Sequence, residues 1–131
     1  PDAPPPAPRP APAEPVWSRT IHPSAVLLFR YSALTMNSHR IHYDKDYVRD
    51  EEGYPGLLVH GPLTMTLMLD LFRRELPDAT MKSFSLRAVS PVYDTMDYSV
   101  HGAPGDDGTC KLWAMTGDGA LAMTADVVYE G

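Results

Sequence analysis

One segment restricts the possible folds more than any other: an apolar stretch that begins at Gly61 and ends just before Pro77. Pro62 fits the first turn of a helix and Pro77 cannot continue one, so the pattern predicts a helix over 61–76. Apolar residues cover far more than one face of this helix, which therefore has to be enclosed by the rest of the chain. They are Leu63, Met65, Leu67, Met68, Leu69, Leu71 and Phe72.

After this helix the apolar pattern changes to a period of two, which is typical of β-strands. Alternating stretches lie at 83–88 and 121–129, and the segments 98–101 and 110–116 complete a series separated by the turn signals APGDDG and TGDG. This half of the chain therefore predicts an antiparallel meander. Because helix and sheet must bury their apolar faces in one core, the sequence predicts an α+β hotdog fold, an antiparallel sheet wrapped around a long central helix.

Length and charge limit the number of domains and the kinds of partner. A chain of 131 residues has room for one ordinary domain. The net charge of −6 argues against nucleic acid, whose binding usually needs a clustered basic face. The apolar runs 25–29 and 67–69 are far shorter than the about 18 residues that span a bilayer, so we expect no membrane partner.

Cysteine usage bears on metals and on location. Cys110 is the only cysteine, so no internal disulfide can form and no second thiol is present for a metal site. We therefore expect no metal. A reducing cytoplasm, or the mitochondrial matrix if the source is eukaryotic, agrees with this composition.

The first fifteen residues, PDAPPPAPRPAPAEP, hold 8 of the 14 prolines and no large apolar side chain. Such a tract prefers an extended, semi-rigid polyproline conformation, so we expect a linker over 1–15 and a single hotdog domain over 16–131. A linker at the start indicates a piece of a longer polypeptide. A tail that joins nothing would have the same composition.

The region between linker and central helix contains one helix and a polar loop. The run Pro23–Thr35 predicts a mostly buried helix, since proline suits its first turn and polar residues are few. The next stretch, 36–56, is polar and predicts a loop with one short helical turn around 44–48. Functional residues tend to lie in such loops.

Within this region the segment YSALTMNSHRIH, residues 31–42, resembles the signature of the MaoC-like (R)-specific enoyl-thioester hydratases. The match includes the aromatic residue Tyr31 and, at the end, His42 in the place of the family's catalytic histidine. Spacing is kept, but four positions differ from the family pattern. Met36 stands for a glycine, Asn37 for the catalytic aspartate, His39 for an asparagine and Arg40 for a proline.

A longer resemblance narrows the comparison. The string FRYSALTMNSHRIHYDKDYV, with GYPGLLVHGPL downstream, looks like mesaconyl- and itaconyl-type CoA hydratases and mitochondrial hydroxyacyl-thioester dehydratases. This resemblance implies the C-terminal hotdog of a double-hotdog protein, whose partner is a second hotdog from its own N-terminal half or from another subunit, as in a dimer. It also implies an acyl-CoA substrate and no cofactor beyond the CoA of that substrate.

Addition of water to an α,β-unsaturated thioester needs a base for the water, a proton for the α carbon and stabilisation of the enolate oxygen. His42 suits the first two needs because its ordinary pKa lies near neutrality. By resemblance Asn37 holds and orients the water through its amide, although asparagine also commonly ends helices. Gly61 begins the central helix, where free N–H groups meet an oxyanion, unless it only makes a tight turn.

Three further residues are candidates for substrate binding. Arg40 and His39 lie beside His42 and suit a substrate with a second carboxylate, such as mesaconyl-CoA, because arginine binds carboxylates bidentately. An ion pair of Arg40 with Asp44 or with a nearby acidic loop residue is an equal alternative. Arg87 is a candidate for the CoA diphosphate or, equally, a solvated strand residue.

Other activities remain open at this point. The chain is expected to be a hydro-lyase, with a (3R)-hydroxyacyl-ACP dehydratase as a close alternative. A hotdog thioesterase needs a carboxylate near the helix, and no Asp or Glu lies between Gly61 and Leu69. A non-catalytic acyl-binding or assembly hotdog would be expected to lack both His42 and the Gly61 turn.

Overall fold

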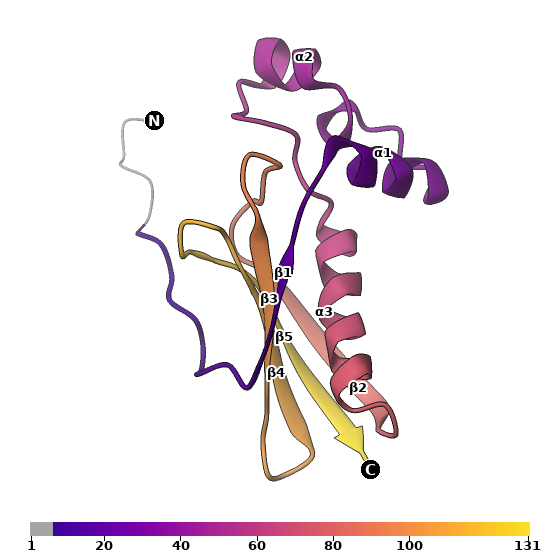
Figure 1. Ribbon diagram of the computed structural model, residues 1–131, viewed down its shortest axis with the longest axis vertical. Helices are drawn as coiled ribbons and strands as arrows, with labels where there is room; N and C mark the ends of the chain where they lie inside the picture. The colour runs from indigo at the N-terminus through magenta and orange to yellow at the C-terminus, as the bar shows by residue number, and fades with distance from the viewer. Residues whose placement is uncertain (1–6) are drawn as a thin grey trace.

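The computed structural model describes residues 7–131 and confirms the α+β hotdog fold (Figure 1). Five antiparallel strands form one sheet in the order β1-β3-β4-β5-β2, and the central helix α3 (Gly61–Glu75) packs along one face of it. Its start and end agree with the two prolines in the sequence. The strands are β1 (Trp17–Ile21), β2 (Thr80–Ala88), β3 (Tyr98–Pro104), β4 (Thr109–Met115) and β5 (Leu121–Glu130).

The core lies between α3 and the sheet. Leu63, Met68 and Phe72 of the helix are buried, because residues at helical spacing share the face that meets the strands. From β4, Leu112 and Ala114 are fully buried, which shows that this strand crosses the middle of the core. Met68, Met123 and Trp113 are buried, and Met65 and Met115 are half-buried.

Strand β1 is an element that the sequence pattern did not predict. It pairs antiparallel with β3, with Trp17 opposite Gly102. A Cβ at Gly102 would overlap the Trp17 ring, so the aromatic side chain lies directly on the glycine backbone. Five residues with only two large apolar side chains give too short a pattern for recognition, and tertiary packing forms the strand.

The predicted linker is described only in part, since residues 1–6 lie outside the described residues. Within it, the carbonyl of Arg9 accepts a hydrogen bond of 2.9 Å from the backbone N–H of Leu121 in β5. This bond ties the segment to one end of the sheet. The boundary between linker and domain at residues 15 and 16 stays a prediction.

Within residues 7–131, strand β2 forms an open edge of the sheet, with β5 as its single neighbour. Phe84 and Leu86, which alternate with polar residues as predicted, remain 44% and 41% exposed. Apolar side chains on an edge strand with free backbone groups are typical of a surface that pairs with another chain or domain.

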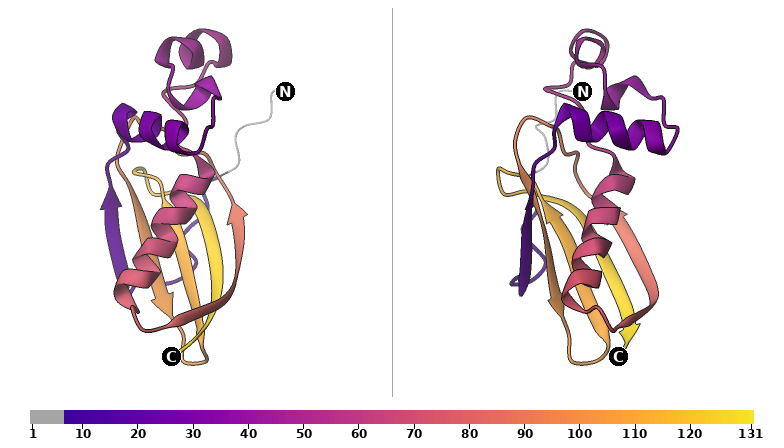
Figure 2. Two further views of the ribbon diagram at one scale, coloured as in Figure 1. Left: turned by 90° about the vertical axis from the view of Figure 1, so that its right-hand side faces the viewer. Right: turned by 45° about the vertical axis from the view of Figure 1, so that its right-hand side comes forward.

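Helix α1 (Ala25–Leu34) forms where the sequence predicted a helix, capped by Ser24, whose Oγ accepts from Leu27 N at 3.0 Å. The expectation that it is mostly buried is wrong: only Leu28 and Ser32 are buried, and Leu34 is 84% exposed. Figure 2 shows the reason, because α1 lies beyond the end of the sheet and only one stripe of it meets the rest of the protein.

The polar loop over 36–56 contains the expected short helical turn and two further turns. It includes a single 3₁₀ turn η1 (Arg40–His42), helix α2 (Lys45–Tyr47) and a π-helical turn η2 (Val48–Glu52) that ends at Gly53 with φ +69°. These turns sit above α3 at the same end of the sheet as α1 (Figure 1). Nowhere in residues 7–131 is a helix both long and apolar enough for a membrane span.

Candidate active site

His42, the last residue of η1, is 7% exposed and its ring has one backbone partner. Nδ1 lies 2.7 Å from the carbonyl oxygen of Leu58. A carbonyl only accepts, so Nδ1 carries the proton and donates it, and the neutral ring has its lone pair on Nε2. Within residues 7–131 no hydrogen-bond partner meets Nε2, which is therefore the nitrogen free to exchange a proton with a substrate.

Burial also controls the charge of His42. Loss of water around the ring lowers its pKa below the usual value, the bond to Leu58 opposes this, and nearby His39 lowers the pKa further. A histidine with a lowered pKa is neutral at physiological pH and available as a base.

A second imidazole lies flat against His42. The rings of His42 and His60 are stacked with centroids 3.8 Å apart and planes at 15°. His60 directly precedes Gly61, so this stacking brings His42 to the start of α3. His60 is 1% exposed, and its contact with His42 was not predicted from the sequence.

The start of α3 opens onto a pocket of about 330 Å³. Gly61 and Thr64 line it from the helix, and Leu58, whose carbonyl holds His42, lines it from the preceding loop. A Cβ at Gly61 would meet only the Met123 Cε, at 3.8 Å, so the glycine leaves the helix start accessible without being sterically required. The first N–H groups of a helix lack internal partners, and they carry partial positive charge.

Asn37 lies at the end of α1, where it completes a helix stop. Met36 has φ +56°, its N–H bonds Ala33 O at 3.3 Å, and the Asn37 N–H bonds Ser32 O at 2.8 Å. This is the arrangement in which glycine usually takes the left-handed position, so Met36 adopts the conformation of the family's glycine without being one. The Asn37 Oδ1 accepts from His39 N at 3.1 Å.

The structure does not bring Asn37 into the pocket of Gly61. It lines a separate hollow of about 260 Å³ with Ser32 and Met36. Its amide nitrogen forms no hydrogen bond with another described residue, so the expected water-orienting function stays a prediction.

Arg40 forms the ion pair that was the alternative to carboxylate binding. Its Nε and Nη2 donate to Asp44 Oδ2 at 3.1 and 2.8 Å, and its guanidinium lies 4.4 Å from the centre of the Tyr47 ring. The pair raises the pKa of Arg40 and contributes to the low pKa of Asp44, after the larger effect of the bond from Tyr47 N. Asp44 is thereby a helix cap for α2 rather than a free base.

His39 stays exposed beside His42, with ring centroids 6.1 Å apart. Its Nδ1 accepts a long bond of 3.4 Å from Ile41 N, which caps the 3₁₀ turn. This contact explains a local role for His39. Substrate binding by His39 or Arg40 stays a prediction.

Arg87 lies at the end of β2 and lines a hollow of about 380 Å³ together with Arg9 from the N-terminal segment. Among residues 7–131, no acidic residue lines this hollow. It shares the segment 88–90 with the Gly61 pocket, so the two lie on neighbouring sides of the same backbone. Arg9 was not among the residues expected from sequence, because the tract around it carries no structural signal.

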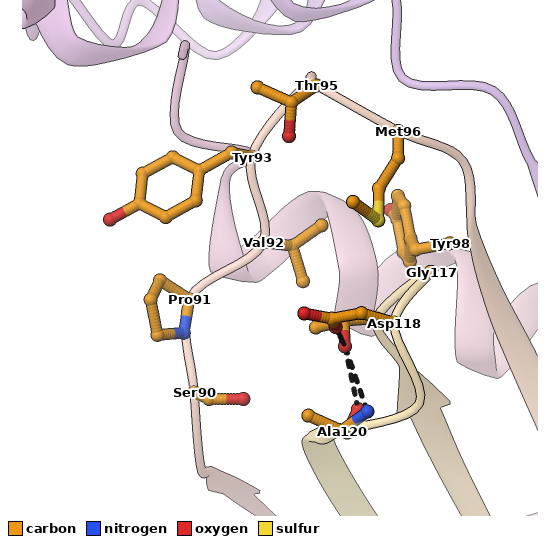
Figure 3. Close-up of a pocket in the computed structure, with 11 residues that line it drawn as sticks. Ser90, Pro91, Val92, Tyr93, Thr95, Met96, Tyr98, Gly117, Asp118 and Ala120 are labelled. Carbon is orange, nitrogen blue, oxygen red and sulfur yellow. Dashed lines mark hydrogen bonds between the residues drawn. The ribbon is translucent and has the colours of Figure 1, made fainter. Parts of the chain in front are cut away.

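A third hollow, of about 250 Å³, adjoins the Gly61 pocket through residues 90–92 (Figure 3). The loop that carries Tyr93 and Met96 and the turn that carries Asp118 both contribute to the lining, with Tyr93 on the opposite side from Asp118 and Met96 next to that turn. Tyr98, at its base, shares a hydrogen bond of 3.2 Å with Thr64 of the Gly61 pocket. Within the part of the chain that the structure describes, no three His, Cys, Asp or Glu residues group as metal ligands.

Comparison with known proteins agrees with the geometry. The family model "Hydroxyacyl-thioester dehydratase type 2" (Htd2) matches residues 1–94. Mesaconyl-C(4)-CoA hydratase of Chloroflexus aurantiacus is 44% identical over 134 aligned residues, which cover 100% of this chain and 47% of that protein. The mitochondrial hydroxyacyl-thioester dehydratase type 2 of Schizosaccharomyces pombe is 41% identical over 60% of this chain and 27% of its own length.

Among solved structures, the (R)-hydratase from A. caviae involved in PHA biosynthesis superposes with a TM-score of 0.69 and 22% identity, covering 91% of this chain and 97% of the other. This likeness shows the fold. The chain spans less than half the length of the two curated relatives it matches. Since the family model covers well over half of the sequence, the chain belongs to the hydroxyacyl-thioester dehydratase type 2 family.

Proposed function

We propose that this chain supplies the acid–base site of a hydro-lyase that adds water to, or removes it from, an α,β-unsaturated acyl-CoA. One observation carries the proposal: the 2.7 Å bond from His42 Nδ1 to Leu58 O, which makes Nε2 the available base beside the start of α3. The names of the two curated relatives, a hydratase and a dehydratase of acyl thioesters, support it.

The reaction follows from these positions. His42 Nε2 takes a proton from water while the water oxygen bonds to the β carbon, and the electron pair of the double bond moves toward the thioester carbonyl. Backbone N–H groups at the start of α3, at Gly61 and Leu63, stabilise the resulting enolate oxygen, since Pro62 has no N–H. The His42 imidazolium then gives the same proton to the α carbon, so one water is added overall.

The pocket composition favours hydration over thioester hydrolysis. None of the residues that line the Gly61 pocket is acidic, and apolar side chains such as Val92 and Met123 predominate. A carboxylate base or nucleophile for a thioesterase is therefore missing from this lining.

We place the CoA phosphates at the hollow of Arg87 and Arg9. Two guanidinium groups, with no acidic neighbour among the described residues of the lining, suit a diphosphate, which arginine binds through paired hydrogen bonds. Thioesters of N-acetylcysteamine lack these phosphates. Replacing both arginines by alanine should raise KM about tenfold or more for crotonyl-CoA and leave KM for crotonyl-N-acetylcysteamine unchanged. Equal changes with both thioesters would remove this assignment.

We further propose a short dicarboxylic acyl group, such as mesaconyl, on the strength of the 44% identical relative. Arg40 is the candidate for the second carboxylate, provided that the substrate exchanges with Asp44 on the guanidinium. Arg40→Met should then reduce kcat/KM for mesaconyl-CoA much more than for crotonyl-CoA. If both fall equally, Arg40 serves only its ion pair and its contact with Tyr47.

A second hotdog is proposed as the partner at the open edge of β2. Phe84 and Leu86 present apolar surface there beside unpaired backbone groups. The greater length of the curated relatives agrees with a second hotdog in the same polypeptide.

The proposed function is tested by incubating the protein with mesaconyl-, itaconyl- and crotonyl-CoA. Loss of the conjugated enoyl absorbance is expected, without release of free thiol. Asn37→Ala should lower the rate if its amide holds the water. Thiol release in place of absorbance loss would identify a thioesterase, and binding without either change would identify a non-catalytic acyl-binding domain.

A further inference from the structure

A buried polar contact joins α1 to the start of α3. Ser32 Oγ lies 2.8 Å from His60 Nε2, and the two side chains are 5% and 1% exposed. Burial of two polar groups costs free energy unless they bond to each other, so apolar residues would hold these helices together at least as well. The polar contact therefore calls for a role beyond packing.

The ring that Ser32 fixes is the ring on which His42 rests. His60 stacks on His42 at 3.8 Å, while Tyr31 of α1 meets His60 at 4.7 Å with its ring tilted by 63°. His60 is thus held by Ser32 at one nitrogen and by aromatic neighbours around its ring. Its other nitrogen, Nδ1, is buried without a partner among the described residues.

Other titratable groups near this stack come from two elements. His42 belongs to η1, His39 caps that turn, and Tyr31 belongs to α1. Burial, and after it the proximity of His42, lowers the pKa of His60 to about 4. His60 consequently stays neutral when His42 takes up a proton, and two adjacent imidazolium ions do not form.

We propose that Ser32 and His60 form a positioning pair, which holds the His42 ring in the orientation that directs Nε2 to the substrate. The Leu58 carbonyl fixes one edge of His42, and the His60 face fixes its plane. The inference rests on the proposed acid–base role of His42. A ring that drifts by about 1 Å loses much of its catalytic effect, which explains why a costly buried contact is worth keeping.

The chain offers a matched control. Ser99 Oγ bonds a nitrogen of His101 at 2.7 Å, within the sheet and away from α3. Ser32→Ala and Ser99→Ala each delete one hydroxyl and one serine–histidine hydrogen bond. Because the Ser99 bond is less buried, Ser99→Ala should lower the melting temperature by no more than Ser32→Ala does.

Only Ser32→Ala should change catalysis. We expect kcat to fall about tenfold with KM unchanged, because a positioning role affects the transition state more than binding. The midpoint of the acidic limb of kcat should also rise, since a looser stack admits water and relieves the burial that lowers the pKa of His42. A lower melting temperature with wild-type kcat and midpoint would overturn the proposal.

A measurement on the wild-type protein keeps the test independent of both stability and substrate. NMR titration of the imidazole groups should show that His42 protonates while His60 remains neutral, with the His42 proton on Nδ1. Protonation of His60 before His42 would overturn the positioning pair. Failure of the proposed function is distinct, since the wild-type protein would then hydrate none of the thioesters.

Discussion

Two groups of histidine and serine residues in this protein differ in how completely their imidazole rings are hydrogen-bonded. The sheet cluster is His101 with Ser18 and Ser99, and the loop cluster is His42 and His60 with Ser32. In the sheet, both ring nitrogens of His101 bond serines, Ser18 and Ser99, each at 2.7 Å. In the loop region, His42 Nε2 and His60 Nδ1 have no hydrogen-bond partner among residues 7–131. The comparison teaches that an imidazole with both nitrogens bonded is committed to structure, whereas an incompletely bonded pair beside a helix start and a pocket is available for chemistry.

The largest expected difference between the clusters is in activity. His42→Ala should lower kcat/KM for the enoyl-CoA about 1,000-fold, because it removes the acid–base group, and should leave the fold intact. His101→Ala should reduce stability and leave kcat/KM near the wild-type value. Parallel rate measurements and thermal melts check both. Full activity of His42→Ala would end the distinction between the clusters.

The second largest expected difference between the two clusters is in how the free energy of unfolding depends on pH. The pKa of His60 is about 4 in the folded protein and 6.5 ordinarily, so the unfolded chain takes up the proton first as the pH falls. The free energy of unfolding should therefore decrease by up to about 3 kcal/mol between pH 6.5 and 4, at about 1.4 kcal/mol per pKa unit. Urea titrations at several pH values measure this.

His60→Gln should flatten that pH dependence. His101→Gln should flatten it less, although burial lowers the pKa of His101 in the same direction. If both substitutions reduce the pH dependence of the free energy of unfolding equally, burial lowers the pKa of His60 no more than that of His101.

Next to the sheet cluster, Gly102 admits no side chain. Gly102→Ala would push a Cβ into the Trp17 ring and to 3.1 Å from Leu112 Cδ2. We expect a loss of about 2 kcal/mol in the free energy of unfolding, from overpacking of β1 on β3. Chemical denaturation checks the value, and an unchanged midpoint would show that β1 separates easily from the sheet.

At Met36, which follows α1 in the loop region, a substitution is expected to change the free energy of unfolding in the opposite direction. Met36→Gly should raise the free energy of unfolding by about 1 kcal/mol, because glycine adopts φ +56° without the strain of a side chain. Activity should persist, since Met36 is 92% exposed. A destabilised glycine variant would show that the methionine side chain contributes packing that outweighs its strain.

The elements with long, regular patterns were predictable from sequence. Prolines at both ends defined α3, and period two defined β2 and β5, because these signals are local. Strand β1 and the exposure of α1 were not predictable, since the first depends on Trp17 covering Gly102 and the second on where the sheet ends. Tertiary contacts decide both.

The site was predictable as a set of residues but not as a network. Resemblance identified His42 and Gly61. In the structure Gly61 lines the pocket at the start of α3, whereas His42 stacks on the preceding His60 and is not itself part of that lining. The resemblance did not identify Ser32 or His60 as neighbours of His42, because 28 residues separate the two members of their hydrogen bond. The ion pair of Arg40 with Asp44 was foreseeable from their spacing on one turn.

The bond from His42 to the carbonyl of Leu58 has an evolutionary consequence. The acceptor is a backbone carbonyl, which every residue type has. A substitution of the side chain at position 58 therefore does not change which tautomer of His42 is favoured. Leu58 also lines the cavity at the start of α3. Substrate preference can therefore diverge at this position among descendants of the protein while the proton-transfer apparatus is inherited intact.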